Sequence, residues 1–196
     1  MSDDHDDSPI AAQVRDLEAL LEAKGLIDPR ELDQVLEAFA ARASPANGFR
    51  VVAHAWVDEG FRERLLAGAD DALPELGLSM GGGLQPQVLH VVENTEQVHN
   101  VIVCTLCSCY PLSLLGPSPT WYKSTAYRSK VVSQPREVLE QFGLDLPRDT
   151  EIRVWDANAE SRYMVLPRRP DGTEGLAEAA LADLVTRNGL IGTAAV

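Results

Sequence analysis

The stretch VHNVIVCTLCSCY, residues 98–110, joins two patterns on which the interpretation of the whole chain depends. Its first half is rich in β-branched residues with near-alternating polarity, a composition that favours a β-strand. Its second half holds all 3 cysteines of the 196-residue chain, Cys104, Cys107 and Cys109. The sequence therefore predicts a group of thiols placed where a strand ends.

Further strands and helices are predicted on both sides of this stretch. Strand-like runs occur at 88–94, 151–158 and 162–167, and helical patterns occur at 51–77, 125–132, 135–142 and 174–187. Prolines should keep 111–119 irregular, because proline lacks the backbone donor that helices and sheets use. We expect mainly hairpin-like strands. The predicted class is α+β, with an N-terminal helical arm followed by a layered α-β-β-α body.

The helical arm is predicted from apolar spacing and from capping residues. Apolar residues at helical spacing indicate a first helix at 10–24, which Gly25 can end. Asp28 followed by Pro29 is typical of the start of a second helix, which runs to about Ala43. The two apolar stripes either clasp another subunit or pack together as an ordinary helical hairpin.

The composition excludes several classes of partner. The chain has 17 basic and 30 acidic residues, a formal net charge of −13, which argues against nucleic acid because phosphate binding needs clustered Lys and Arg. No apolar run approaches the about 18 residues of a membrane span, and the acidic start MSDDHDDSP lacks the features of a signal peptide. We therefore predict a cytoplasmic protein with no nucleic-acid or membrane partner.

The spacing C-x-x-C-x-C limits what the thiols can do. Structural zinc and iron–sulfur clusters usually take four protein ligands, whereas this stretch offers three sulfurs. His90 and His99 flank the cluster and are expected to be ordinary surface or core histidines. A redox pair of Cys104 and Cys107 would leave Cys109 unused and lacks the usual helix at the first cysteine.

Another arrangement uses the backbone between the cysteines. If the chain curls, the sulfurs of Cys107 and Cys109 and the peptide nitrogens of Ser108 and Cys109 can surround one ion, with Cys104 on one axial side. Deprotonated amide nitrogens suit a trivalent ion such as cobalt or iron better than zinc. The opposite axial position would stay open for water or substrate, which a Lewis acid can activate.

These residues resemble the α subunits of nitrile hydratases. VCTLCSCY (103–110) is similar to the metal-binding loop of that family, and C-x-x-C-x-C becomes specific in this surrounding sequence. The similarity spans roughly residues 48–192 and includes VVENT (91–95), TWYKS (120–124), YRSKVV (127–132), PREVLEQFG (135–143) and EIRVWDANAESRYMVLPRRPDGTEGL (151–176).

The resemblance implies a cofactor and a modified site. It implies low-spin Co(III), one per subunit, held by the sulfurs of Cys104, Cys107 and Cys109 and by the backbone nitrogens of Ser108 and Cys109. It also implies that Cys107 is oxidised to cysteine sulfinic acid and Cys109 to cysteine sulfenic acid. The residues that the resemblance assigns to catalysis are Cys107, Ser108, Cys109 and Gln85. The implied reaction hydrates a nitrile to the amide, by sulfenate attack or through an activated water.

The same resemblance implies partners and a domain organisation. A β subunit, made of one or two chains, supplies arginines to the oxidised sulfurs, and an activator protein inserts cobalt. Thr105 and Tyr110 are the cobalt-type choices, where iron-type members carry Ser and Thr, so iron is less favoured. The expected domains are a disordered acidic tail at 1–9, a helical arm at 10–47 and a metal-binding catalytic domain at 48–196.

Three further residues are assigned to the substrate pocket. Gln85 occupies the place of a glutamine that helps position groups beside the metal, and Tyr110 shapes the pocket mouth. Leu112 stands where the family usually has Trp, in CYPWP. Replacing an indole by Leu enlarges the pocket, which favours a bulky or heteroaromatic nitrile such as toyocamycin.

Two alternatives stay open on sequence alone. The γ subunit of thiocyanate hydrolase shares the cobalt loop and performs a related hydration at a C≡N group. A non-enzymatic metal carrier or redox module could also use three clustered thiols.

Overall fold

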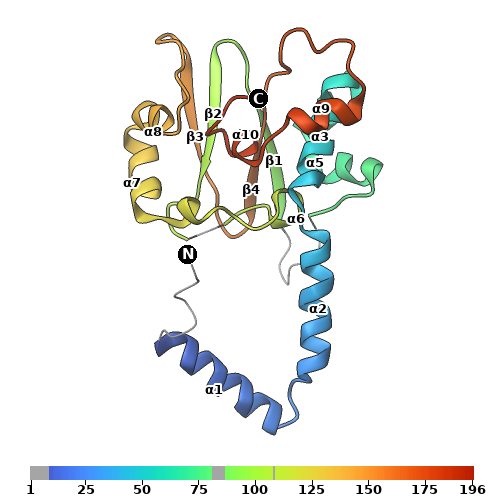
Figure 1. The fold of residues 1–196 in the computed structure, drawn as a ribbon, viewed down its shortest axis with the longest axis vertical. Coiled ribbons are helices and arrows are strands. Elements are labelled where there is room, and N and C mark those ends of the chain that lie inside the picture. Colours follow the sequence, from blue (N-terminus) through green and yellow to red (C-terminus); the bar gives the residue numbers. More distant parts are fainter. Residues whose placement is uncertain (1–8, 81–86, 108) are drawn as a thin grey trace. The chain divides into compact units, whose positions relative to one another are not determined.

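The computed structural model describes residues 9–80, 87–107 and 109–196, and Figure 1 shows their fold. The chain forms two compact units, Met1–Arg42 and Ala43–Val196. Residues 1–8 of the predicted acidic tail lie outside the described residues. Among the residues that are described, none of the helices combines the length and the apolar character that a bilayer span needs.

The first unit contains the two predicted helices, α1 (Pro9–Ala23) and α2 (Pro29–Arg42). Gly25 has φ 65°, the left-handed conformation that commonly ends a helix. The side chain of Asp28 accepts a hydrogen bond from the backbone N–H of Arg30 at 2.9 Å, which caps the start of α2. Both predicted helix signals are therefore confirmed. Helix α1 buries none of its residues, so its apolar stripe is exposed.

The second unit alternates short helices with strands. Its helical elements before the first strand are α3 (Pro45–Val57), α4 (Glu59–Ala67), α5 (Ala69–Ala72) and η1 (Leu73–Leu76). The strands are β1 (Val88–Glu93), β2 (Val98–Val103), β3 (Glu151–Asp156) and β4 (Ser161–Leu166). The remaining helical elements are α6 (Leu112–Leu115), η2 (Thr120–Lys123), α7 (Thr125–Ser133), α8 (Pro135–Gln141), α9 (Glu178–Leu184) and α10 (Arg187–Ile191).

The strands pair in parallel across long sequence separations. Strand β1 pairs with β4 and β2 pairs with β3, each as a 2-stranded sheet. The expectation of mainly hairpin-like strands is therefore wrong, because strands that follow one another in sequence do not share these ladders. Strand β2 shows the physical reason. Val101, Ile102 and Val103 are 0–1% exposed, and such a continuous apolar run is typical of a strand covered on both faces.

Helices cover the strands on opposite sides. Helices α7 and α8 lie beside β3, whereas α3, α4 and α5 lie on the side of β1 (Figure 1). Helix α10 packs against β4, and α9 packs against α3. The predicted α+β class with a layered body is thus confirmed.

Two predicted segments differ in detail. The helix expected at 174–187 is split into α9 and α10, because Val185 is extended and the Thr186 side chain caps a new helix at Gly189 N–H. The irregular segment after the cysteines contains one short helical turn, α6, whose Leu114 and Leu115 side chains are buried in the core.

Residues near the C-terminus contact the amino end of β2. The buried His99 ring makes a 2.7 Å hydrogen bond with the carbonyl of Gly192 and a 3.2 Å bond with the Asn94 amide. Burial lowers the pKa of His99, so the ring is a neutral core group. The prediction that His99 is an ordinary core histidine agrees with this placement. Gly192 itself has φ 87°, and a Cβ there would collide with the carbonyl oxygen of Asn100.

We expect Gly192→Ala to destabilise the protein strongly. A left-handed alanine costs about 1–2 kcal/mol, and overpacking against Asn100 adds about 1–3 kcal/mol. Gly172→Ala is the matched control, since Gly172 has φ 78° and a Cβ added there would meet nothing within 4 Å. Urea unfolding monitored by circular dichroism measures both. Equal losses of unfolding free energy in the two variants would contradict the proposed contact.

Candidate metal centre

The cysteine loop begins where β2 ends. Parallel pairing aligns Val103 at the end of β2 with Asp156 at the end of β3. The backbone N–H of Ala157 donates to the Val103 carbonyl at 2.7 Å, so the ladder extends one residue beyond the strands. Cys104 follows directly. The loop therefore starts at the carboxyl edge of a rigid strand pair, where functional groups of parallel sheets commonly gather.

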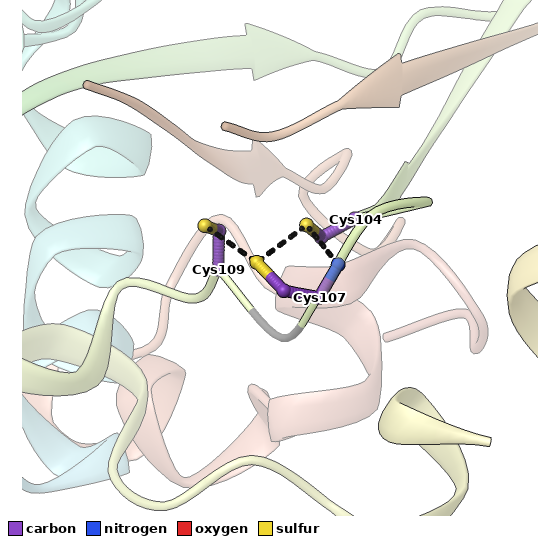
Figure 2. Close-up of side chains that lie close together, drawn as sticks. All are labelled: Cys104, Cys107 and Cys109. Carbon is purple, nitrogen blue, oxygen red and sulfur yellow. Dashed lines mark hydrogen bonds between the residues drawn. The ribbon is translucent and has the colours of Figure 1, made fainter. Parts of the chain in front are cut away.

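The loop brings its three sulfurs together. The Sγ atom of Cys107 lies 3.3 Å from that of Cys104 and 3.2 Å from that of Cys109. Figure 2 shows Cys107 between the other two thiols. The backbone N–H of Cys107 also donates to the Cys104 sulfur at 3.3 Å, which closes the curl. All three sulfurs lie within 4.8 Å of one another, a spacing that one metal ion can bridge.

Burial divides the cluster into a closed and an open side. Cys104 is buried at 0% exposure, Cys109 is intermediate and Cys107 is exposed. Leu106, between the first two cysteines, is 84% exposed. The cluster is thus anchored in the core through Cys104 and open to solvent or a partner through Cys107.

Without a metal, Cys109 favours the thiol over the thiolate. Burial, together with the hydrogen bond to Cys107, raises the pKa of the Cys109 thiol to about 12. Metal binding requires thiolate, so an ion entering this loop must displace protons. A strongly polarising ion therefore suits the donor set.

The donor set fits a thiophilic metal. In the part of the chain that the structure describes, these three cysteines are the group of His, Cys, Asp and Glu side chains that converges within ligand distance. His99 is bonded to the C-terminal turn, and the exposed His90 ring packs on Tyr163 with centroids 5.2 Å apart. Three sulfurs without a histidine are a soft ligand set, which favours a thiophilic metal ion over Mg²⁺ or Ca²⁺.

Aromatic residues support the loop from beneath. Tyr122 is fully buried, and its hydroxyl donates to the Cys109 carbonyl at 3.0 Å. Tyr127 donates to the carbonyl of Ile102 in β2 at 2.5 Å. Tyr110 is 5% exposed and packs edge-on against Tyr122, with ring centroids 5.1 Å apart. The loop therefore packs on tyrosines from the motifs TWYKS (120–124) and YRSKVV (127–132).

Three charged residues lie at the loop, and none of them was predicted from sequence to belong to the metal site. The Asp156 carboxylate accepts from the backbone N–H and the hydroxyl of Thr105 at 2.9 and 2.6 Å. Arg128 donates to the carbonyls of Thr105 and Cys107 at 3.3 and 3.5 Å. A sequence signal did exist for Asp156, because it ends the strand EIRVWD and polar residues at the carboxyl ends of parallel strands are functional candidates.

The third charged residue is Arg162 at the start of β4. It is 8% exposed and donates to the carbonyls of Asn158 and Ser161, while its Nε has no hydrogen-bond partner among the described residues. The described residues include no carboxylate paired with it. Its positive charge acts on Cys109 and lowers the pKa of that thiol, against the larger effect of burial. A buried cation near the sulfurs favours their anionic forms.

The residues predicted for the pocket have different placements. Tyr110 lies in the core beneath the loop, and Leu112 begins α6 with 40% of its surface exposed. Gln85 and Ser108 lie outside the described residues. The structure therefore brings the three predicted sulfurs together. Leu112 follows Cys109 by three residues in the sequence.

We expect the thiols of the metal-free chain to react in an order set by their burial. Iodoacetamide at pH 8 should label exposed Cys107 first, label Cys109 slowly because its raised pKa keeps it protonated, and leave Cys104 unlabelled. Peptide mass spectrometry over time measures this order. Labelling in urea is the control and should be uniform, whereas rapid labelling of Cys104 in the folded chain would contradict the described burial.

Comparison with known proteins places this geometry in a family. The family model for nitrile hydratase, alpha chain, matches residues 8–194. The low-molecular weight cobalt-containing nitrile hydratase subunit alpha of Rhodococcus rhodochrous is 50% identical over 183 residues, which cover 93% of this chain and 87% of that protein. Thiocyanate hydrolase subunit gamma of Thiobacillus thioparus is 37% identical over 202 residues, covering 95% of this chain and 83% of that subunit.

A solved structure has the same fold. A double mutant of the Fe-type nitrile hydratase from Comamonas testosteroni Ni1 superimposes with a TM-score of 0.88 at 41% identity, covering 97% of this chain and 91% of that one. The family model, the relatives and the solved structure each match nearly the whole chain. The chain belongs to the nitrile hydratase alpha chain family.

Proposed function

We propose that this chain is the α subunit of a cobalt-dependent nitrile hydratase, which catalyses R–C≡N + H2O → R–CO–NH2. One observation carries the proposal. The sulfurs of Cys104, Cys107 and Cys109 lie within 4.8 Å of one another at the carboxyl edge of β2 and β3, in a member of this family.

Cobalt is proposed over iron on two grounds. Three relatives, 50%, 46% and 45% identical to this chain, are named as cobalt-containing nitrile hydratase α subunits. Thr105 and Tyr110 also match the cobalt-type loop. Cys104, Cys107 and Cys109 would hold the ion, with the backbone nitrogens of Ser108 and Cys109 as further ligands. When bound, low-spin Co(III) supplies Lewis acidity that polarises the nitrile.

The chain's own residues divide the remaining work. Buried Cys104 anchors the site to the core, whereas Cys107 is exposed and Cys109 is partly exposed. We propose that molecular oxygen converts Cys107 to sulfinic acid and Cys109 to sulfenic acid. The Cys109 oxygen then either takes a proton from the attacking water or attacks the nitrile carbon itself, in which case the oxygen of water replaces it as the amide leaves. Gln85 is proposed to position the reacting groups. Ser108 is proposed to join the hydrogen bonds around the sulfinate.

The partners follow from the open side of the cluster. Oxidised sulfurs carry negative oxygens, and the exposed Cys107 and Leu106 leave them accessible to another chain. A β subunit of one or two chains is proposed to cover this side and to supply arginines. A cobalt-insertion activator is proposed to load the ion.

The holoenzyme is proposed to be cytoplasmic, with a helical arm at 10–47 and a catalytic domain at 48–196.

The substrate is proposed to be bulky or heteroaromatic, such as toyocamycin. This proposal rests on Leu112, which is 40% exposed at the start of α6 just beyond the cysteine loop. A Leu side chain there occupies less space than an indole and provides no N–H donor.

Reconstitution with the β subunit and cobalt tests the proposed activity. We expect about one cobalt per α chain, peptide masses that show a sulfinic acid at Cys107 and a sulfenic acid at Cys109, and amide formation from nitriles. Cys109→Ala should reduce turnover to background, because it removes both a ligand and the oxidised sulfur. Release of carbonyl sulfide and ammonia from thiocyanate would instead favour a thiocyanate hydrolase subunit. Stoichiometric zinc with unmodified cysteines would favour a non-enzymatic metal module.

Substitution of Leu112 tests the proposed substrate size. Leu112→Trp should lower kcat/KM for a heteroaromatic nitrile by about tenfold or more, while acrylonitrile turnover changes less. Leu176→Trp is the matched control, because Leu176 has a similar exposure of 42% against 40% for Leu112 and lies outside the cysteine loop. Equal effects on the small and the large nitrile would contradict a pocket role for Leu112.

A further inference from the structure

The segment between Cys104 and Cys107 is held from one side by a single carboxylate. Asp156 uses one oxygen for the Thr105 backbone N–H and the other for the Thr105 hydroxyl, at 2.9 and 2.6 Å. Hydrogen bonds to an ionised carboxylate are stronger than neutral ones. Asp156 is itself placed by the sheet, because it pairs with Val103 at the end of β2.

Arg128 holds the same segment through its carbonyls. Its guanidinium donates to the carbonyl of Thr105 at 3.3 Å and, more weakly, to that of Cys107 at 3.5 Å. Arg128 comes from α7, whose neighbouring Tyr127 is fixed to the Ile102 carbonyl of β2. The loop is therefore hydrogen-bonded to Asp156 from a strand and to Arg128 from a helix.

The hydrogen bonds with Asp156 and Arg128 support a segment that has no helix or strand hydrogen bonds of its own among the described residues. Residues 105–107 form bends rather than a helix or strand, and Cys107 and Leu106 are exposed. Asp156 accepts hydrogen bonds from the backbone N–H and the hydroxyl of Thr105, and Arg128 donates to the carbonyls of Thr105 and Cys107. Removing the Thr105 hydroxyl deletes one of these bonds while leaving the backbone N–H in place.

We propose that Asp156, acting through the hydroxyl of Thr105, and Arg128 are positioning residues that hold the cysteine loop curled for metal capture. The inference rests on the proposed function for its cobalt readout. Groups that orient metal ligands typically change metal affinity by about 10- to 100-fold when they are removed. The order of the loop, in contrast, is a property of the metal-free chain and can be measured without the ion.

The experiment compares Thr105→Val, Thr105→Ser, Asp156→Asn and Arg128→Met in the full chain. Valine keeps the β-branched shape and loses the hydroxyl, whereas serine keeps the hydroxyl. Asp149→Asn is the control for removal of a carboxylate, since Asp149 is exposed near the opposite end of β3. Hydrogen–deuterium exchange of loop peptides in the metal-free chain is measured first, and thermal unfolding checks that each variant folds.

We expect faster exchange at the loop in Thr105→Val, Asp156→Asn and Arg128→Met. Thr105→Ser and Asp149→Asn should stay close to wild type. In the complex with the β subunit, the apparent affinity for cobalt, measured by titration with Co²⁺ during loading, should fall by about 10- to 100-fold in Thr105→Val and Asp156→Asn. Thr105→Ser should lose less cobalt affinity than Thr105→Val, because it keeps the hydroxyl.

The two proposals fail in different ways. Unchanged loop exchange in Thr105→Val and Asp156→Asn would overturn the positioning role, whether or not cobalt binds. A wild-type complex that retains no cobalt would overturn the proposed function, while the exchange data would still decide the positioning role. Equal losses of cobalt affinity in Thr105→Ser and Thr105→Val would also overturn the positioning role, because the hydroxyl would then not be the group required.

Discussion

The pairing of β2 with β3 is the constraint on which the site depends. Because the two strands are parallel, their carboxyl ends meet, and Val103 lies opposite Asp156. The cysteine loop leaves one strand and its carboxylate anchor ends the other. The buried run at the end of β2 holds the first cysteine still, and the C-terminal turn around Gly192 fixes the opposite end of the same strand. A shift in this register would move the anchor away from the loop.

The site combines a rigid base with an exposed face. Cys104 belongs to the buried part of the molecule, and Tyr122 secures the Cys109 carbonyl from below. Cys107 remains exposed. This division suits a centre that must be held in place by one polypeptide and completed by another. Buried Arg162 adds positive charge to the same region, which favours anionic sulfur.

Patterns of residues close together in sequence predicted many helices and strands and the cysteine cluster. Helix caps at Asp28 and Gly25, the apolar run of β2 and the clustering of the cysteines all depend on residues close together in sequence. The partners of the strands could not be predicted in this way, and the hairpin expectation was wrong because the ladders form across long separations. Asp156 and Arg128 were missed for the same reason, since they lie 51 and 23 residues from Thr105.

Parallel pairing also means that the cysteine loop and the strand that supports it are synthesised at different times. The ribosome completes the cysteine loop before it adds the helices α7 and α8, and β3 is made later still. A nascent chain thus carries three adjacent thiols without the strand, the carboxylate or the C-terminal turn that shape them in the finished fold. The ligands are encoded together, but the strand, the carboxylate and the turn around Gly192 that support them come later in the sequence.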